Sequence, residues 1–224
     1  MDTNVLAAMA RWPHVPHVYG WMSLSEQGRW RLHPLADAWH PGLPCPEPLT
    51  QGESIESPQI LSFIGRNFTC DEQGRWFFQN GPQRVYVRLD VAPFVLHTDS
   101  TEPSLRTHND LAVTETKSWW IDDSGRLYAM TEHGAGLVSG RDTPAVFDAL
   151  HTADGRPLPD VLEQYVSPGK VVPRTHPATP EAITRVRFTV SAPGGQTHTT
   201  DVPLYYCASD KLATAMGFVR CPHP

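Results

Sequence analysis

The sequence predicts an α+β protein, made mainly of antiparallel hairpins in one or two twisted sheets with short helices at the edges and on one face. The first indication is the segment Cys70–Leu96, which combines two turn signals with bulky and alternating apolar residues. The second is a turn tetrapeptide of this segment that recurs on either side of it. The third is the clean alternation of apolar and polar residues over 185–190, before a Pro-Gly-Gly turn.

The segment Cys70–Leu96 predicts two turns and two strands. Asp71-Glu72-Gln73-Gly74 is polar and ends in glycine, which suits a turn that needs a positive φ. Asn80-Gly81 is a strong hairpin signal, and Pro82 after it implies a loop longer than two residues. From Val85 onward, apolar residues alternate with Tyr86, Arg88 and Asp90, so we expect one buried face and one solvated face.

The same turn opening occurs in 24–32 (LSEQGRWRL) and in 121–129 (IDDSGRLYA). The glycines of the three copies, Gly28, Gly74 and Gly125, are 46 and 51 residues apart. A spacing of this kind is typical of repeat proteins, although three imperfect copies are too few for a closed propeller. Two explanations stay open: a repeated hairpin motif, or a common turn sequence that recurs by chance.

The remaining elements follow from periodicity and capping signals. Pro58–Asn67 shows helical spacing of apolar residues, with Ser57 as N-cap and proline at the first position. The predicted helices are Asn4–Trp12, Pro58–Asn67, Pro144–Leu150 (capped by Asp142 or Thr143), Pro159–Tyr165 and Ser209–Met216 (capped by Ser209 or Asp210). The predicted strands are 18–21, 29–32, 75–78, 85–91, 111–116, 117–121, 185–190, 197–206 and 218–220. The segments 41–58 and 97–110 are predicted to be a connection and a surface loop.

The domain organisation predicted from these elements has three parts. Residues 1–150 form a hairpin body with repeats near 18–40, 59–97 and 111–150. Residues 151–180 are a proline-rich connection, and residues 181–224 form a C-terminal hairpin and helix.

Composition limits the classes of partner. The chain has 224 residues, a net charge of −6 and no cluster of Lys and Arg, which argues against nucleic acid and anionic membranes as partners. The first residues lack a positive segment followed by a long apolar one, and no stretch reaches the ~20 apolar residues of a membrane span. We therefore expect a soluble, cytoplasmic protein.

The run FIGRNFTCDEQGRWFFQNGPQRVYVRLDVAPFVL, from Phe63 to Leu96, resembles an uncharacterised family of proteobacterial proteins with a domain of unknown function. The resemblance extends from Trp12-Pro13 to Gly217-Phe218-Val219. The chain is also similar, more faintly, to another bacterial domain of unknown function, in which a D-G-x-W strand, a G-x-P-x-R turn and an L-F-x-x-L strand recur. Such domains are associated with ligand sensing or signalling. The resemblance implies a bacterial, soluble protein and carries over no catalytic residue.

Metal and cofactor signals are weak. Four cysteines in a chain without an export signal predict reduced thiols. Cys207, Cys221 and His223 could supply three zinc ligands, but no C-x-x-C pair and no fourth ligand accompany them. The eleven histidines are scattered, and His14-x-x-His17 flanks Pro16 and so cannot lie on a helix. We predict neither a metal nor a cofactor.

Motifs for nucleophilic catalysis are equally weak. A nucleophile elbow has the form G-x-S-x-G, which the chain lacks. Val138-Ser139-Gly140 matches it loosely, without the first glycine and without an expected buried strand before it. Gly134-x-Gly136 lacks the third glycine of a dinucleotide site.

Polar residues bracket the predicted hairpins and are the candidate binding residues: Asn80, Gln83, Arg84, His133, Arg141 and Asp142. In one interpretation they only serve turns and caps, with Arg84 lying flat beside Trp76. In the other, turns converge on a shallow pocket where Arg84 or Arg141 holds an anion.

Three functions are compatible with this sequence. The first is a non-enzymatic binding or regulatory module for an unidentified small ligand or protein partner. The second is a small enzyme with a loop-built site in which His97, His108 or His133 is the general base, near Asp110 or Glu132. The third is a structural subunit, for example of a homodimer. Its interface would use the pairs Trp119-Trp120 and Tyr205-Tyr206.

Overall fold

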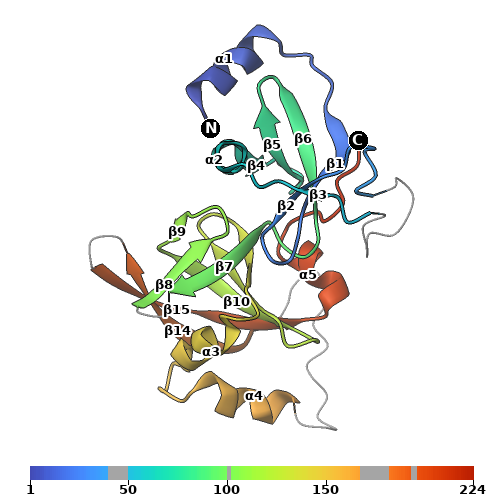
Figure 1. Ribbon diagram of the computed structural model, residues 1–224. Coiled ribbons are helices and arrows are strands. Elements are labelled where there is room, and N and C mark those ends of the chain that lie inside the picture. Colours follow the sequence, from blue (N-terminus) through green and yellow to red (C-terminus); the bar gives the residue numbers. More distant parts are fainter. Residues whose placement is uncertain (40–49, 100–101, 167–181, 193–195) are drawn as a thin grey trace. The chain divides into compact units, whose positions relative to one another are not determined.

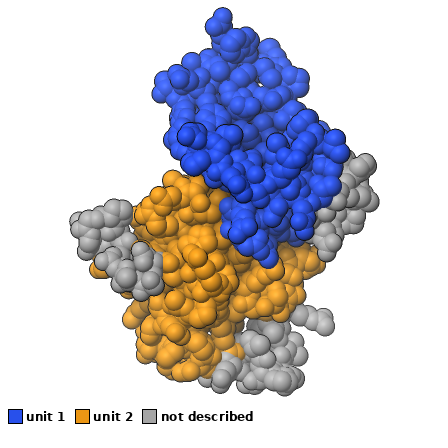
Figure 2. Space-filling model, in the orientation of Figure 1, with its two compact units in different colours: residues 1–93, 217–224 blue, residues 94–216 orange. Residues whose placement is uncertain are grey.

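The computed structural model of the chain describes residues 1–39, 50–99, 102–166, 182–192 and 196–224. These residues form two compact units, shown in Figure 2. Unit 1 comprises Met1–Pro93 together with Gly217–Pro224, and unit 2 comprises Phe94–Met216. The predicted boundaries at 150 and 180 do not coincide with this division. The C-terminal eight residues return to unit 1 because their backbone pairs with strands of that unit.

Unit 1 is a six-stranded sheet with two helices (Figure 1). Its elements are α1 (Thr3–Arg11), β1 (Val18–Leu24), β2 (Trp30–Leu32), β3 (Glu53–Ser54), α2 (Pro58–Arg66), β4 (Phe68–Cys70), β5 (Trp76–Asn80) and β6 (Gln83–Leu89). The strand order is β3-β2-β1-β6-β5-β4. Its C-terminal segment is bonded to the sheet, since Val219 N donates to Gly74 O (2.9 Å) and Leu89 N donates to Arg220 O (2.8 Å).

Unit 2 is a nine-stranded sheet with three helices. Its elements are β7 (Phe94–Asp99), β8 (Glu102–Thr107), β9 (Ala112–Val113), β10 (Thr116–Asp122), β11 (Leu127–Thr131), β12 (Ala135–Val138), α3 (Thr143–Ala149), β13 (His151–Thr152), α4 (Leu158–Val166), β14 (Ala182–Ala192), β15 (Gln196–Cys207) and α5 (Ser209–Ala215). The strand order is β13-β14-β15-β10-β11-β12-β7-β8-β9. The sheet curls strongly, because β14 also contacts β8 and β9 at the far end of this order.

Both sheets are assembled from three-stranded antiparallel meanders that follow one another along the chain. The five meanders are β1–β3, β4–β6, β7–β9, β10–β12 and β13–β15. Within each unit, the first strand of one meander pairs in parallel with the last strand of the next: β1 with β6, β7 with β12, and β10 with β15. The same joining rule in three places indicates internal repetition of a meander.

The turn singled out in the sequence has one hydrogen-bonding pattern in all three predicted copies, 25–29, 71–75 and 122–126. The N–H of the first residue donates to the carbonyl of the fifth, the glycine N–H donates to the first carbonyl, and the first side chain accepts from the fifth N–H. The pattern recurs at 152–156 and at 107–111. In the last copy Asp110 replaces glycine and keeps the positive φ, at 67°.

The predicted fold class and all five predicted helices are confirmed, with ends shifted by one or two residues. The N-cap of α5 is Ala208 rather than Ser209 or Asp210. Residues 97–110, predicted as a loop, contain β8 and the end of β7. Of the predicted last strand, Val219 forms an isolated bridge to Arg75. The predicted connection 41–58 lies mostly outside the described residues, as does the latter half of 151–180.

The prediction of one buried and one solvated face for 85–91 was wrong, because both faces of β6 are covered. Tyr86 is 0% exposed and Arg88 is 1% exposed, on the face opposite Val85 and Val87. None of the helices in the described part of the chain is long and apolar enough to cross a membrane.

Candidate functional site

A face of the unit 1 sheet carries three aromatic rings on adjacent strands. Tyr19 of β1 stacks on Tyr86 of β6, with ring centroids 4.6 Å apart, and Tyr86 packs at 5.4 Å against Phe77 of β5. Two arginines lie over this ladder: Arg75 is 4.9 Å from the centroid of Tyr86, and Arg84 is 4.6 Å from that of Phe77. We call these five residues the arginine–aromatic face. Arg84 thus lies beside Phe77, and the predicted contact with Trp76 was wrong, because Trp76 alternates to the other face.

The two arginines of this face differ in their partners, because Arg75 is paired with a carboxylate and Arg84 is not. Arg75 Nε donates to Asp71 Oδ2 (2.8 Å), and its other nitrogens bond His223 O (2.8 Å) and the Tyr86 hydroxyl (3.3 Å). Arg84 makes no hydrogen bond or ion pair to any described residue, and its guanidinium is half-buried. Partial burial, followed by the charges of Arg84 and Arg75, lowers the pKa of His17 below its ordinary value. The local potential is therefore positive in a protein of net charge −6.

Asn80 and Gln83 are opposite each other at the ends of β5 and β6. Gln83 Nε2 donates to Pro16 O (3.0 Å) and ties the start of β1 to this hairpin. Asn80 is exposed, and its side chain forms no hydrogen bond to a described residue. Both residues thus lie near Arg84, at the end of the hairpin.

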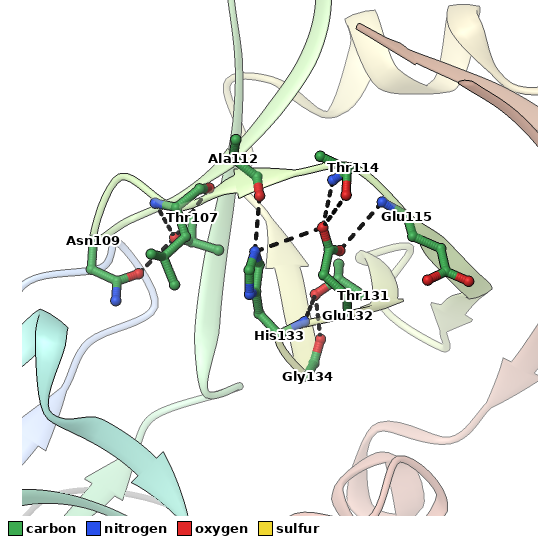
Figure 3. A network of polar contacts seen from close by, with 10 residues as sticks. Thr107, Asn109, Ala112, Thr114, Glu115, Thr131, Glu132, His133 and Gly134 are labelled. Atoms are coloured by element: carbon green, nitrogen blue, oxygen red, sulfur yellow. Dashed lines mark hydrogen bonds and ion pairs between the residues drawn. The ribbon is translucent and has the colours of Figure 1, made fainter. Parts of the chain in front are cut away.

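The other predicted residues belong to unit 2. His133 lies in the turn between β11 and β12, where Figure 3 shows it beside the segment that follows the β8–β9 turn. His133 Nε2 donates to Ala112 O (2.8 Å) and is 3.7 Å from Glu132 Oε1. The Glu132 carboxylate accepts from the Thr114 amide (2.6 Å) and hydroxyl (2.8 Å) and, more weakly, from the Glu115 amide (3.4 Å). Burial opposes ionisation of Glu132, but these hydrogen bonds hold its pKa below the ordinary value.

The network in Figure 3 therefore fastens the β11–β12 turn to β9 and to the residues that follow it. Near it, the Phe94 ring lies 5.9 Å from the ring of His108 and 6.3 Å from that of His133. His108 Nδ1 accepts from Val95 N (3.3 Å). Burial, and to a lesser degree the charge of His97, lowers the pKa of His108 to about 3. A buried, neutral imidazole of this kind does not exchange protons with a substrate near neutral pH.

Arg141 and Asp142 lie together at the start of α3. His97 Nδ1 donates to Asp142 Oδ2 (3.1 Å), and Arg141 Nε lies 3.4 Å from the same oxygen. The side chain of His97 is 30% exposed and that of Asp142 is 11% exposed. His97 thus combines a carboxylate that accepts a hydrogen bond from its ring with access to solvent.

A serine–histidine contact, which sequence reasoning missed, lies inside unit 1. Ser23 Oγ is 2.8 Å from His33 Nε2, and His33 Nδ1 is 2.9 Å from Thr50 Oγ1, which donates to Asp37 (3.2 Å). Because Thr50 gives its proton to Asp37, it accepts from Nδ1, and Nε2 accepts from Ser23. Ser23 and His33 are 2% and 0% exposed, so this relay is a core network without access for a substrate.

The cysteines depart from the prediction of four reduced thiols. Cys221 is disulfide-bonded, whereas Cys70 and Cys207 are free thiols and Cys45 lies outside the described residues. Cys221 packs with Ala38, Trp39 and the ring of Tyr19. A cysteine in a disulfide cannot supply a zinc thiolate, and the described residues contain no group of metal-ligating side chains.

The predicted interface pairs are not two exposed patches. Trp119 and Trp120 are buried in unit 2, where they contact Phe188 and Tyr205 respectively. Tyr205 and Tyr206 are half-buried. The tryptophan pair therefore gives no support to an interface.

Neither unit by itself contains all six predicted site residues. Asn80, Gln83 and Arg84 lie in unit 1, and His133, Arg141 and Asp142 lie in unit 2. Sequence reasoning missed His17, Tyr19 and Arg75 as neighbours of Arg84. The alternation Arg84, Tyr86, Arg88 was a usable signal, since residues two apart on a strand share a face.

Comparisons with known proteins give a family. A family model named DUF2944, described as "Protein of unknown function (DUF2946)", matches residues 1–223. No curated protein matches the chain. Among solved structures, a DUF1285 family protein from Silicibacter pomeroyi DSS-3 matches with 16% identity over 69% of this chain and 88% of that chain, at a TM-score of 0.43. A DUF1285 family protein from Shewanella baltica OS155 matches with 13% identity over 56% of this chain and 88% of that chain, at a TM-score of 0.39. Because the family model spans nearly the whole chain, the protein belongs to this family of proteins of unknown function.

Proposed function

We propose that the protein is a binding module whose unit 1 takes a small anionic ligand on the arginine–aromatic face. The observation that carries the proposal is that the positive charge of Arg84 has no anionic partner among the described residues. Its guanidinium is stacked on Phe77 and has no acceptor among the described residues, although Asp71 neutralises the neighbouring Arg75.

This arrangement matches the way proteins recognise carboxylate and phosphate groups. Stacking on an aromatic ring holds the planar guanidinium in place and leaves its edge free for two parallel hydrogen bonds to an anion. Burial is the main cause of the lowered pKa of His17, and the charges of Arg84 and Arg75 lower it further. An anion bound at Arg84 would relieve this repulsion, so binding should raise the pKa of His17.

Titration calorimetry with citrate and pyrophosphate as probes tests the proposal. We expect saturable binding that weakens as the salt concentration rises, and loss of binding in Arg84→Ala. Arg11→Ala is the matched control, because Arg11 also lies over an aromatic ring, at 4.7 Å from the Trp12 centroid, on α1. Equal binding by the Arg84→Ala and Arg11→Ala variants would refute a site at Arg84.

Native mass spectrometry of untagged protein gives an independent readout. A retained small anion in the wild type, absent from the Arg84→Ala protein, would identify the ligand by mass. The same spectrum reports whether the protein is a monomer or the homodimer that we consider possible.

A further inference from the structure

Ser139 lies between a buried strand and a helix in unit 2. The strand β12 (Ala135–Val138) is buried at every position and ends immediately before Ser139, and α3 begins at Thr143. The expectation that no buried strand precedes Ser139 was therefore wrong. Strand, turn serine and helix follow in the order found at nucleophile elbows. The φ of Ser139 is not positive, so this turn is unstrained and does not need the glycines of G-x-S-x-G.

His97 is brought beside Ser139 by the parallel pairing of β7 with β12. Leu96 and Val138 are register partners, and Ser139 N donates to Leu96 O (2.8 Å), which extends the ladder by one step. His97 follows Leu96 in β7, and Ser139 is the first residue after β12. Residues in register on parallel strands project to the same side of a sheet, with Cα atoms roughly 5 Å apart.

The imidazole of His97 is oriented by Asp142. Its Nδ1 donates to Asp142 Oδ2 at 3.1 Å, which leaves Nε2 as the acceptor. Asp142 is the N-cap of α3 but makes no side-chain cap bond, so its carboxylate is available to His97. In serine hydrolases, too, a carboxylate bonds Nδ1 of the histidine, while Nε2 of the same ring faces the nucleophilic hydroxyl.

Donors for a developing oxyanion adjoin Ser139. The N–H groups of Asp142 and Thr143 donate to Ser139 O (2.8 and 3.0 Å), whereas those of Gly140 and Arg141 donate to no acceptor in the described part of the chain. The space above Gly140 is open, since a Cβ placed there would meet no atom within 4 Å. In hydrolases whose nucleophilic serine lies in a turn between a strand and a helix, the backbone N–H of the residue after the serine stabilises the oxyanion.

We propose that Ser139, His97 and Asp142 form a hydrolytic site for small carboxylic esters. Ser139 Oγ adds to the ester carbonyl carbon while its proton passes to His97 Nε2. The ester C–O bond then breaks, and the leaving alcohol takes that proton. Water then adds to the acyl carbon while His97 Nε2 accepts a proton from it. The bond between the acyl carbon and Ser139 Oγ breaks, His97 returns the proton to Ser139 Oγ, and the acid leaves. Ser139 and His97 are the catalytic residues, and Asp142 is a positioning residue.

The test uses the full chain, p-nitrophenyl acetate and a fluorophosphonate probe. We expect saturable hydrolysis, and a single covalent adduct on the peptide that contains Ser139. Ser139→Ala should abolish the adduct and lower kcat by about 10²-fold or more, with an unchanged melting temperature. Ser209→Ala is the matched control, because Ser209 also lies where a strand is followed by a helix, at the first position of α5 after β15, and its replacement should leave hydrolysis unchanged.

The two partner residues separate catalysis from a structural role. His97→Gln should remove both hydrolysis and labelling. Asp142→Asn should lower kcat with little change in KM, and Asp142→Glu should restore part of it. Unchanged hydrolysis in Ser139→Ala, or an adduct on another residue, would overturn the proposal, and so would the absence of any labelling in folded wild-type protein.

Discussion

Asp71 and Asp122 occupy the same position in two turns of different units, and each accepts a hydrogen bond from a tyrosine hydroxyl. The Tyr86 hydroxyl donates to Asp71 Oδ2 (3.0 Å), and the Tyr128 hydroxyl donates to Asp122 Oδ2 (2.9 Å). In both turns the other carboxylate oxygen accepts from the backbone amides inside the turn. One aspartate thus closes the hairpin and anchors a buried tyrosine of a nearby strand.

Replacing Asp71 with alanine should therefore destabilise unit 1. The change removes four hydrogen bonds, to the amides of Gln73 and Arg75, the Arg75 guanidinium and the Tyr86 hydroxyl. We expect the free energy of unfolding to fall by about 2–4 kcal/mol, measured by urea denaturation. Glu72→Ala, an exposed change in the same turn, should cost less than about 0.5 kcal/mol. Similar losses in the two variants would contradict this account.

Two turn glycines should respond differently to alanine. Gly125 and Gly74 have φ of 77° and 75°, so either substitution should cost about 1–2 kcal/mol for left-handed backbone. A Cβ on Gly125 meets nothing within 4 Å, whereas one on Gly74 would lie 2.4 Å from Gly217 O. Gly74→Ala should therefore cost about 1–3 kcal/mol more. Because the clash is with the C-terminal segment, hydrogen exchange of the Val219 amide should rise in Gly74→Ala and stay unchanged in Gly125→Ala.

The buried His108 predicts a loss of stability in weak acid. Its pKa is about 3 in the folded protein and about 6.5 in an unfolded chain, so below pH 6.5 the unfolded state binds more protons. The free energy of unfolding should fall as the pH drops from 6.5 toward 3, by up to about 1.4 kcal/mol per pH unit from this group. Denaturation at pH 7 and pH 5 measures the slope. His108→Gln should have a shallower slope over this range, and an identical slope would show that other groups are responsible.

The cysteines should fall into three reactivity classes. Without reduction, Cys221 should be recovered in a cross-linked peptide, and Cys70 should react with iodoacetamide in the folded protein. Burial, and then the charge of Asp71, raises the pKa of the Cys70 thiol, so its alkylation should accelerate as the pH rises through 9. Buried Cys207 should react only after denaturation. Alkylation of Cys221 in unreduced protein would contradict the disulfide and favour the predicted cytoplasmic location.

The local sequence determined most of the elements of this protein. Five helices and the principal hairpins follow from short-range signals, such as Pro58 at a first helical position or Gly28, Gly74 and Gly125 in turns, because caps and positive φ angles depend on neighbouring residues alone. The recurring turn was also visible. Three of its five copies were recognised; the copy at 152–156 was missed, and the copy at 107–111 was hidden because Asp110 takes the place of glycine.

The tertiary structure decided which polar residues meet. Arg84 lies on Phe77 because β5 and β6 pair in one register, and His97 meets Asp142 because β7 runs parallel to β12, some 40 residues further along the chain. It also buried Arg88, which the alternation along 85–91 placed on a solvated face. Parallel pairing between separate meanders is set by packing of whole sheets, and no signal within a few residues encodes it.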